Sequence, residues 1–227
     1  MFFLKLKYFL YYYKSKLLKK KCKKIYKVEK IKFEQKLLKK NFSNKWFLNN
    51  YDIFTFFLPQ DKNLKFDYLE VGCFEGLSSF YVLSEYKFVN AYFLDIWDIP
   101  NSNSKTLSEN FGPIEKAFDD NLTEYNFTKM KDDSVVSMRK LLRKNKSFDF
   151  IYIDGSHNGE DILSDAIESF KLLKVNGLIF FDDFLQHDSD RQIQSYEGIQ
   201  KFLSLYSNYL IIEYFQNNLV VRKKNKI

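Results

Sequence analysis

The sequence predicts an α/β fold, a three-layer sandwich in which helices cover both faces of a mostly parallel sheet that ends in an antiparallel hairpin. Short apolar runs alternate with segments of helical length, which is the pattern of repeated βα units. The stretch from Ser147 to Phe184 contains one complete unit of strand, helix and strand. The last two apolar runs, at 209–215 and 219–222, are separated only by Gln216-Asn217-Asn218, and this spacing predicts the hairpin.

Charge is divided unevenly along the 227-residue chain. Residues 1–50 hold 16 lysines and two acidic residues, a net charge of +14, whereas the remainder holds 20 basic and 27 acidic residues, a net charge of −7. We therefore expect a basic, aromatic N-terminal arm at 1–40 and a single domain at 41–227. The two cysteines, Cys22 and Cys73, lie far apart without metal-ligand spacing, which favours a reducing, cytoplasmic setting.

The arm begins with an apolar, aromatic segment, Met1 to Tyr13, and continues as a lysine-rich helical candidate, Lys14 to Lys40. The apolar segment is shorter than the roughly 20 residues of a membrane span, and it lacks the charge order of a signal peptide. A basic helix beside an aromatic segment is suited to an anionic membrane surface. A solvated arm that packs loosely or supports homo-oligomerisation is the alternative, and both remain open.

The first half of the domain shows helix and strand signals in alternation. Residues 41–59 predict one or two short capping helices, and Phe66 to Val71 predicts the first strand, which is followed by a helix from Leu77. The remaining elements of this half are a strand at 89–96, a helix at 113–122 that starts with proline, a strand at 127–130, and a helix from 134 to about 144 that Asp133 or Ser134 caps.

The second half repeats the pattern with longer apolar runs. Phe148 to Ile153 predicts a strand, 160–173 predicts a helix, and Asn176-Gly177 is expected to close that helix. The wholly apolar run 178–181 predicts the next strand, and 195–207 predicts a helix before the hairpin.

A glycine turn links the first strand to its helix. Gly72-Cys73-Phe74-Glu75-Gly76 is followed by Ser78 in the first helical turn, which is typical of a nucleotide-type binding element. The turn departs from the dinucleotide fingerprint at Phe74. Asp95 ends the next strand about twenty residues later, where α/β nucleotide sites place an acid for the ribose hydroxyls. The alternative is an acid that merely caps a turn.

Four further polar residues follow two other strands. Asp154 and His157 follow one strand, and Asp182 and Asp183 follow the next. Carboxyl ends of parallel strands share one sheet edge, so these residues should converge. Three carboxylates at one place repel each other unless they are protonated, paired or metal-bound, and Mg²⁺ prefers such oxygen ligands. The alternatives are solvated strand-end acids and a loop histidine bonded to backbone.

Four segments together resemble the class I S-adenosylmethionine-dependent methyltransferases, which have a Rossmann-like fold. The segments are LEVGCFEG at 69–76, FLDIW at 93–97, FDFIYIDGSH at 148–157 and LLKVNGLIFFDDF at 172–184. Within that class the chain looks most like the family of macrolide-sugar (macrocin-type) O-methyltransferases, relatives of the catechol type. The resemblance covers about Asn44 to Arg222 and leaves the arm out.

The resemblance implies S-adenosylmethionine and Mg²⁺ as cofactors. The residues that match the family's cofactor pocket are Glu70, Gly72, Gly76, Ser78, Asp95, Trp97, Asp133 and Ser134. The first four would surround the methionine part, Asp95 would hold the ribose hydroxyls, Trp97 would flank the adenine, and the Asp133-Ser134 turn would meet the adenine edge. Asp154, Asp182 and Asp183 match the magnesium ligands, and His157 matches the proposed general base, with Asp154 beside it in the catalytic site.

The expected function is methyl transfer to a hydroxyl of a sugar or another small polar acceptor. The lysine-rich arm raises the alternative of a nucleic-acid methyltransferase, but the acidic domain disfavours phosphate binding near the site. The other alternative is a non-catalytic cofactor-binding module tethered by the arm. Loops at 98–112 and 185–195 are expected to select the acceptor.

Overall fold

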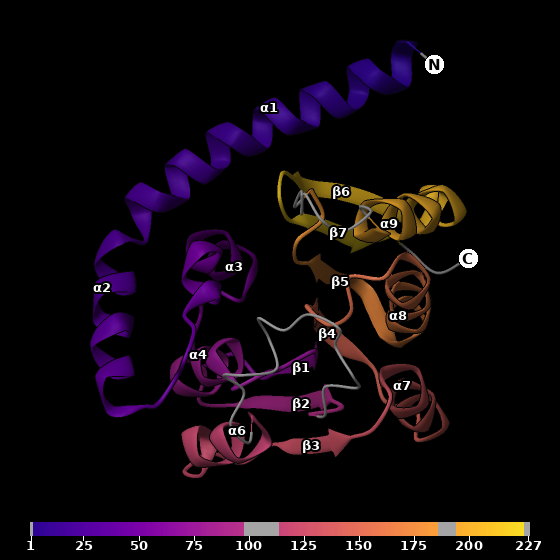
Figure 1. Ribbon diagram of the computed structural model, residues 1–227. Helices are drawn as coiled ribbons and strands as arrows, with labels where there is room; N and C mark the ends of the chain where they lie inside the picture. Colours follow the sequence, from indigo (N-terminus) through magenta and orange to yellow (C-terminus); the bar gives the residue numbers. More distant parts are fainter. Residues whose placement is uncertain (1, 98–113, 186–193, 225–227) are drawn as a thin grey trace, which may run out of the picture.

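The computed structural model describes residues 2–97, 114–185 and 194–224, with side chains from residue 8 onward, and these residues form three layers (Figure 1). The middle layer is a seven-stranded sheet with the strand order β3-β2-β1-β4-β5-β7-β6. Its strands are β1 (Phe66–Val71), β2 (Val89–Asp95), β3 (Thr128–Lys131), β4 (Phe148–Ile153), β5 (Leu173–Phe181), β6 (Leu210–Phe215) and β7 (Leu219–Lys223).

Helices cover both faces of this sheet. The helices are α1 (Phe2–Ile25), α2 (Lys27–Lys36), α3 (Tyr51–Phe57), α4 (Leu77–Glu85), α6 (Ile114–Leu122), α7 (Ser134–Arg143), α8 (Gly159–Leu172) and α9 (Gln194–Leu205). Figure 1 shows α3, α4 and α6 on one face and α7, α8 and α9 on the other, with α2 outside α3 and α4. The predicted fold class is therefore confirmed, and apart from β5 each strand lies within one residue of its predicted bounds.

The order of strand pairing creates a switch point between β1 and β4. Strands β1 to β5 are parallel, whereas β7 runs antiparallel to β5 and β6. From β1 the chain builds outward to β2 and β3, and it then returns to add β4 and β5 on the other side of β1. Ligands in open α/β sheets bind beyond the carboxyl ends of the strands at such a point.

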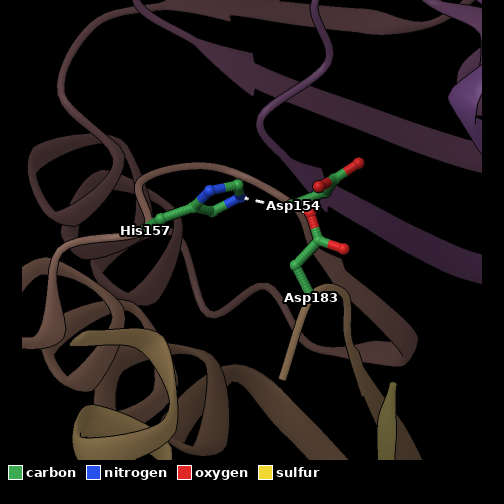
Figure 2. A group of neighbouring side chains, drawn as sticks. All are labelled: Asp154, His157 and Asp183. Carbon is green, nitrogen blue, oxygen red and sulfur yellow. Dashed lines mark ion pairs between the residues drawn. The ribbon is translucent and has the colours of Figure 1, made fainter. Parts of the chain in front are cut away.

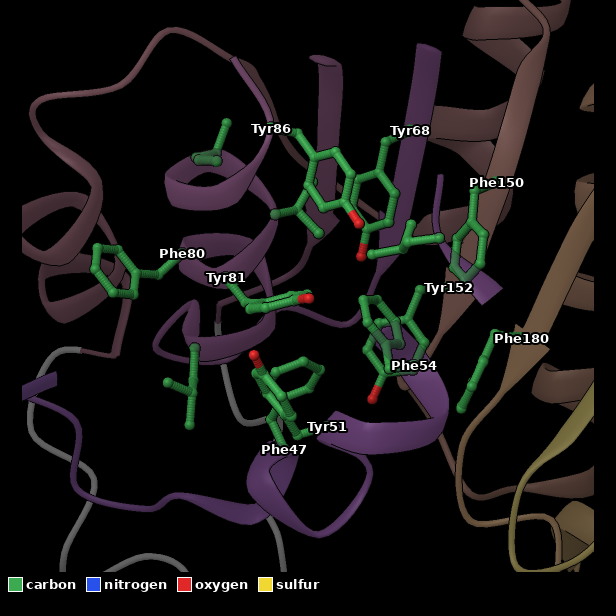
Figure 3. Packing of buried hydrophobic residues seen from close by; sticks show 14 of the residues in the cluster. Phe47, Tyr51, Phe54, Tyr68, Phe80, Tyr81, Tyr86, Phe150, Tyr152 and Phe180 are labelled. Carbon is green, nitrogen blue, oxygen red and sulfur yellow. The ribbon is translucent and has the colours of Figure 1, made fainter. Parts of the chain in front are cut away.

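The two faces of the sheet bury different kinds of side chain. On the α3 and α4 side, alternate strand residues are aromatic, and Figure 3 shows Phe150, Tyr152 and Phe180 gathered around Phe54 of α3. The ring of Phe54 lies 4.9 Å from that of Tyr152, centroid to centroid, at a steep interplanar angle that suits the ring quadrupoles. The intervening strand residues, such as Ile151 and Ile179, pack on the opposite face beneath α7, α8 and α9.

The predicted arm contributes to the same core. Cys22, Phe33 and Leu37 are buried in the cluster that contains α3 and α4. The inner face of α1 packs on the terminal hairpin, where the Phe215 backbone N–H donates to Ser15 Oγ at 2.8 Å. Within the described parts of the chain, every helix is too short or too polar to span a bilayer. A domain boundary at residue 40 stays a prediction.

The prediction that Asn176-Gly177 closes a helix is wrong. Helix α8 ends at Leu172, and β5 begins at Leu173, which pairs with Phe148. The register is irregular between Phe148 and Phe150, and Asn176 within the irregular stretch has a φ of +66°. Asn-Gly signals a helix end and a strand bulge equally well, because both need a residue that tolerates positive φ.

Substitution of Gly72 tests the tight contact at the switch point. A Cβ on Gly72, where φ is +84°, would lie 2.2 Å from the backbone oxygen of Asp154. Gly72→Ala should therefore lower the free energy of unfolding by about 2–3 kcal/mol or more, measured by urea denaturation. Gly155→Ala is the matched control, because its Cβ would meet nothing nearer than 3.7 Å and should change stability by less than about 0.5 kcal/mol. Equal effects of the two substitutions would contradict this account.

Candidate functional site

The turn after β1 lies directly against the loop after β4. Gly72 has no side chain to separate it from Asp154, and the backbone N–H of Asp154 donates to the carbonyl of Val71 at 2.8 Å. The N–H of Gly72 donates to Leu94 at the end of β2 at 2.9 Å. The carboxyl ends of β1, β2 and β4 are thus joined by backbone contacts. The glycine turn and the loop that contains Asp154 are therefore neighbours.

Glu70 is wholly buried and orients the helix that follows the turn. Its carboxylate accepts hydrogen bonds from Ser78, from Ser79 at 3.0 Å and from the Tyr68 hydroxyl at 3.0 Å. Burial raises the pKa of Glu70 to about 7, although these three hydrogen bonds oppose the shift. Glu70 and Ser78 therefore bond to each other beneath the turn, and their contact with a cofactor remains a prediction.

Asp95 binds the backbone of the glycine turn. One carboxylate oxygen accepts from the N–H groups of Cys73 at 2.7 Å and Phe74 at 2.9 Å, and the other accepts from Trp97 at 2.8 Å. This is the turn-capping arrangement that the sequence left open as an alternative. A carboxylate offers about four acceptor positions, and the contacts within the described residues use three of them. A bond from Asp95 to a ribose stays a prediction.

The two predicted adenine contacts lie on neighbouring elements. The Trp97 indole donates to the carbonyl of Phe74 at 3.0 Å, and its ring packs on Phe118 with a centroid distance of 4.7 Å. Asp133 accepts from the N–H of Val136 at 3.0 Å and is the N-cap of α7, which confirms one of the two predicted caps. Ser134 instead donates to Asp165 at 2.5 Å. A role of these residues toward adenine stays a prediction.

Asp154, His157 and Asp183 form a compact group at the edge of the sheet (Figure 2). Each can offer one ligand atom such that all three atoms lie within 4.8 Å of one another. His157 Nε2 lies 3.5 Å from a carboxylate oxygen of Asp183. Asp154 and His157 come from the loop after β4, and Asp183 comes from the end of β5. The three side chains therefore meet at the carboxyl ends of the neighbouring strands β4 and β5.

Asp182 lies next to this group in a buried network of its own. Its oxygens accept from Asn50 at 2.8 Å each, from the Tyr152 hydroxyl at 2.6 Å, from the Asp183 backbone at 2.8 Å, and from Asn218. The carboxylate is thus saturated by uncharged donors. The resemblance places Asp182 among the magnesium ligands, and that role stays a prediction.

Sequence reasoning did not find the donors around Asp182. Tyr152 had a signal, because it is two residues before Asp154 and therefore on the same side of its strand. Asn50 is 132 residues away from Asp182, and Asn218 was interpreted only as part of a hairpin turn. No local pattern connects residues that meet only through the folded sheet.

Burial raises the pKa values of all three acids at this edge of the sheet. Burial, and then the charges of Asp182 and Asp183, raise the pKa of Asp154 well above its usual range. Burial and the charge of Asp182 raise the pKa of Asp183 to about 7. Burial also raises the pKa of Asp182, although hydrogen bonds from Tyr152 and its other donors oppose this. A cation beside Asp154 and Asp183 would favour their ionised forms.

A family comparison agrees with this geometry. The model of a family described as "Methyltransferase domain" matches residues 69–184, about half of the chain, from β1 to the end of β5. The chain belongs to this methyltransferase family. The match includes the glycine turn, Asp95, the Asp154 to His157 loop and the Asp182-Asp183 pair. A search of curated protein sequences found no match.

Solved structures share the fold of this methyltransferase at low sequence identity. MycE methyltransferase from the mycinamycin biosynthetic pathway, in complex with Mg, SAH and mycinamycin VI, is 17% identical with a TM-score of 0.57, over 86% of this chain and 54% of MycE. An O-methyltransferase from Bacillus cereus in complex with SAH is 15% identical with a TM-score of 0.51, over 70% and 74% of the two chains. A putative caffeoyl-CoA O-methyltransferase from Staphylococcus aureus is 15% identical with a TM-score of 0.57, over 92% and 100%.

These comparisons confirm the predicted class, that of the class I S-adenosylmethionine-dependent methyltransferases. The chain spans about half the length of MycE, so likeness to that structure concerns the methyltransferase fold. Of the loops expected to select the acceptor, 98–112 lies outside the described residues, as does most of 185–195.

The raised pKa of Asp183 predicts a pH-dependent cost to stability in metal-free protein. Between its unfolded pKa of about 3.9 and its folded pKa of about 7, the folded state binds the proton more tightly, so stability falls as pH rises through this window. Asp183→Asn removes this penalty. In the presence of a chelator, the melting temperature of the variant minus that of the wild type should be larger at pH 8 than at pH 4.

An exposed residue provides the control for this prediction. Asp120 is largely solvent-exposed and pairs only with Lys116 on the surface of α6 among the described contacts, so Asp120→Asn should shift the melting temperature equally at both pH values. The account fails if Asp183→Asn shows the same pH-independent difference as Asp120→Asn.

Proposed function

We propose that the protein is an S-adenosylmethionine-dependent O-methyltransferase that uses Mg²⁺ and acts on a hydroxyl of a sugar or another small polar acceptor. The convergence of Asp154, His157 and Asp183, next to the Gly72 turn, is the observation that carries this proposal. Support comes from MycE, whose described complex holds Mg, SAH and mycinamycin VI, and from the Bacillus cereus O-methyltransferase, whose complex holds SAH.

The residues of the glycine turn fit a nucleotide-like cofactor. The turn leads straight into the N-terminus of α4, where unpaired backbone N–H groups favour a negatively charged group such as a carboxylate. Asp95 lies at the same edge, and its bonds to Cys73 and Phe74 hold the turn in shape. When bound, S-adenosylmethionine supplies the electrophilic methyl group and Mg²⁺ lowers the pKa of the acceptor hydroxyl.

The donor set of the acidic group fits a hard cation. Asp154 and Asp183 offer carboxylate oxygens, which Mg²⁺ prefers, whereas an imidazole nitrogen suits softer transition metals. His157 would therefore act as the general base that takes the proton of the acceptor hydroxyl. The ordinary pKa of histidine, about 6.5, is suitable for this role. Asp183 lies 3.5 Å from His157 Nε2 and would stabilise the imidazolium after it takes the proton.

Asp182 would act on this site by positioning its neighbour. Its carboxylate accepts from the backbone N–H of Asp183 and is held by Asn50 and Asn218 from two other parts of the chain. This network fixes the backbone at the end of β5, so that the side chain of Asp183 is directed toward Asp154 and His157. A positioning role explains why Asp182 is buried among uncharged donors.

Cofactor binding is tested by calorimetry with S-adenosylmethionine. Asp95→Ala should weaken binding by about tenfold or more, because a charge-assisted hydrogen bond is worth about 1.5–3 kcal/mol. Asp95→Asn keeps one acceptor oxygen for the backbone of the turn, so it should weaken binding of S-adenosylmethionine less than Asp95→Ala does. Comparison of the two variants separates loss of a ribose contact from collapse of the turn. Asp61→Ala, in an exposed turn, is the control and should bind as wild type does. A folded wild-type protein that binds no S-adenosylmethionine would refute the proposal.

Metal dependence is tested by titrating Mg²⁺ into the cofactor-bound protein. Asp183→Asn should abolish detectable Mg²⁺ binding, whereas Asp182→Asn should weaken it by a smaller factor, because Asp182 positions rather than coordinates. His157→Gln should leave Mg²⁺ binding intact and lower kcat by about 10²-fold or more on a found acceptor. Turnover that is indifferent to chelator, or equal loss of Mg²⁺ binding in Asp182→Asn and Asp183→Asn, would contradict these assignments.

A further inference from the structure

The outward face of α1 changes from apolar to basic along the helix. Phe9, Tyr13 and Leu17 follow each other at one-turn spacing and are 62%, 56% and 58% exposed, and the rings of Phe9 and Tyr13 stack at 6.4 Å. At the same spacing, the face continues with Lys20 and Lys24, which are also exposed. Large apolar side chains in a contiguous exposed row mark an interaction surface.

The opposite face of α1 is already packed against the domain. Ser15 and Cys22 are buried, and the side-chain amide of Gln216 donates to the carbonyl of Tyr12 at 2.9 Å. The ring of Tyr8 stacks on Phe215 of β6 at 5.3 Å. The helix is therefore fixed to the terminal hairpin. Phe9, Tyr13 and Leu17 stay exposed although the helix is packed on the domain.

The charge pattern indicates what this face binds. From residue 8 to residue 28 the sequence contains lysines and no acidic residue, whereas residues 51–227 carry a net charge of −7. A negatively charged surface would attract α1 and repel the acidic domain, so the two effects together orient the molecule with α1 toward that surface. A second copy of the chain is less suited, because pairing two such helices would bring two arms of like charge together.

We propose that the outward face of α1 docks on an anionic lipid surface. The row of Phe9, Tyr13 and Leu17 would enter the boundary between headgroups and acyl chains, and Lys20 and Lys24 would contact lipid phosphates. The helix would lie along the surface, since no described helix can cross a bilayer. This inference is independent of the proposed reaction, because it assumes no chemistry at the candidate site.

Vesicle co-sedimentation of the full-length protein tests the proposal. Wild type should bind phosphatidylcholine vesicles that contain phosphatidylserine, and binding should fall steeply without phosphatidylserine or at high salt. Phe9→Ser with Tyr13→Ser should lower the partition coefficient by about tenfold or more, since it removes two large inserted side chains. Lys20→Glu with Lys24→Glu should have an effect of about the same size.

Substitutions elsewhere on the surface provide the controls. Phe88→Ser removes a similarly exposed ring outside the arm, and Lys87→Glu with Lys201→Glu reverses two exposed charges there, so both variants should bind as wild type does. Point substitutions are preferred to truncation of the arm, because Cys22, Phe33 and Leu37 belong to the core. Circular dichroism checks that each variant is folded.

Two results would overturn the proposal. The first is equal vesicle binding by the α1 variants and by their controls. A folded wild-type protein that does not bind the vesicles would count as the same result. The second is a wild-type dimer in light scattering that the Phe9 and Tyr13 substitutions dissociate while vesicle binding is unchanged. That second result would identify the face as a contact between copies of the chain.

Discussion

The close approach of two backbones at Gly72 and Asp154 is the constraint on which the site depends. Strands β1 and β4 are neighbours because the sheet reverses its building direction there, and Gly72 allows the turn after β1 to touch the loop after β4. The glycine turn and the acidic group consequently lie side by side at one edge of the sheet. Methyl transfer requires two bound molecules in line, and such proximity supplies a large part of the acceleration in bimolecular reactions.

The acids at this edge are divided between two environments. Asp182 is surrounded by uncharged donors from Asn50, Tyr152 and Asn218, which satisfy its oxygens. Asp154 and Asp183 lie beside His157 with raised pKa values, and a cation there would favour their ionised forms. The Tyr152 hydroxyl lies 2.6 Å from an oxygen of Asp182 and 3.0 Å from an oxygen of Asp154, so it connects the two environments. This difference is the basis on which we propose positioning for Asp182 and chemistry for Asp154 and Asp183.

The N-terminal helices support this arrangement from outside the family match. Phe33 of α2 stacks on Tyr51 of α3 with a ring distance of 5.5 Å, in the aromatic cluster between the helices. Asn50, the residue before Tyr51, holds Asp182. The arm thus contributes inward packing that reaches the site through α3, while its outward face offers the apolar and basic surface assigned to lipid.

The sequence by itself determined the elements and the edge at which the polar residues gather. Alternation of apolar residues located the strands, and the parallel arrangement placed Asp95, Asp154 and Asp183 at a common edge, because each directly follows or ends a strand. It also limited the cap of α7 to Asp133 or Ser134, since capping depends on residues close in the chain, and the structure shows Asp133.

Only the tertiary structure decided how these residues are paired. It brought His157 together with Asp154 and Asp183, and it supplied Asn50 and Asn218 as donors to Asp182 from distant parts of the chain. It also showed that Asn176 lies in β5 and does not close α8. Leu173 already pairs with β4, a contact that no local pattern reveals. Periodicity reports which face a residue occupies, whereas its hydrogen-bond partners depend on which segments the sheet brings alongside it.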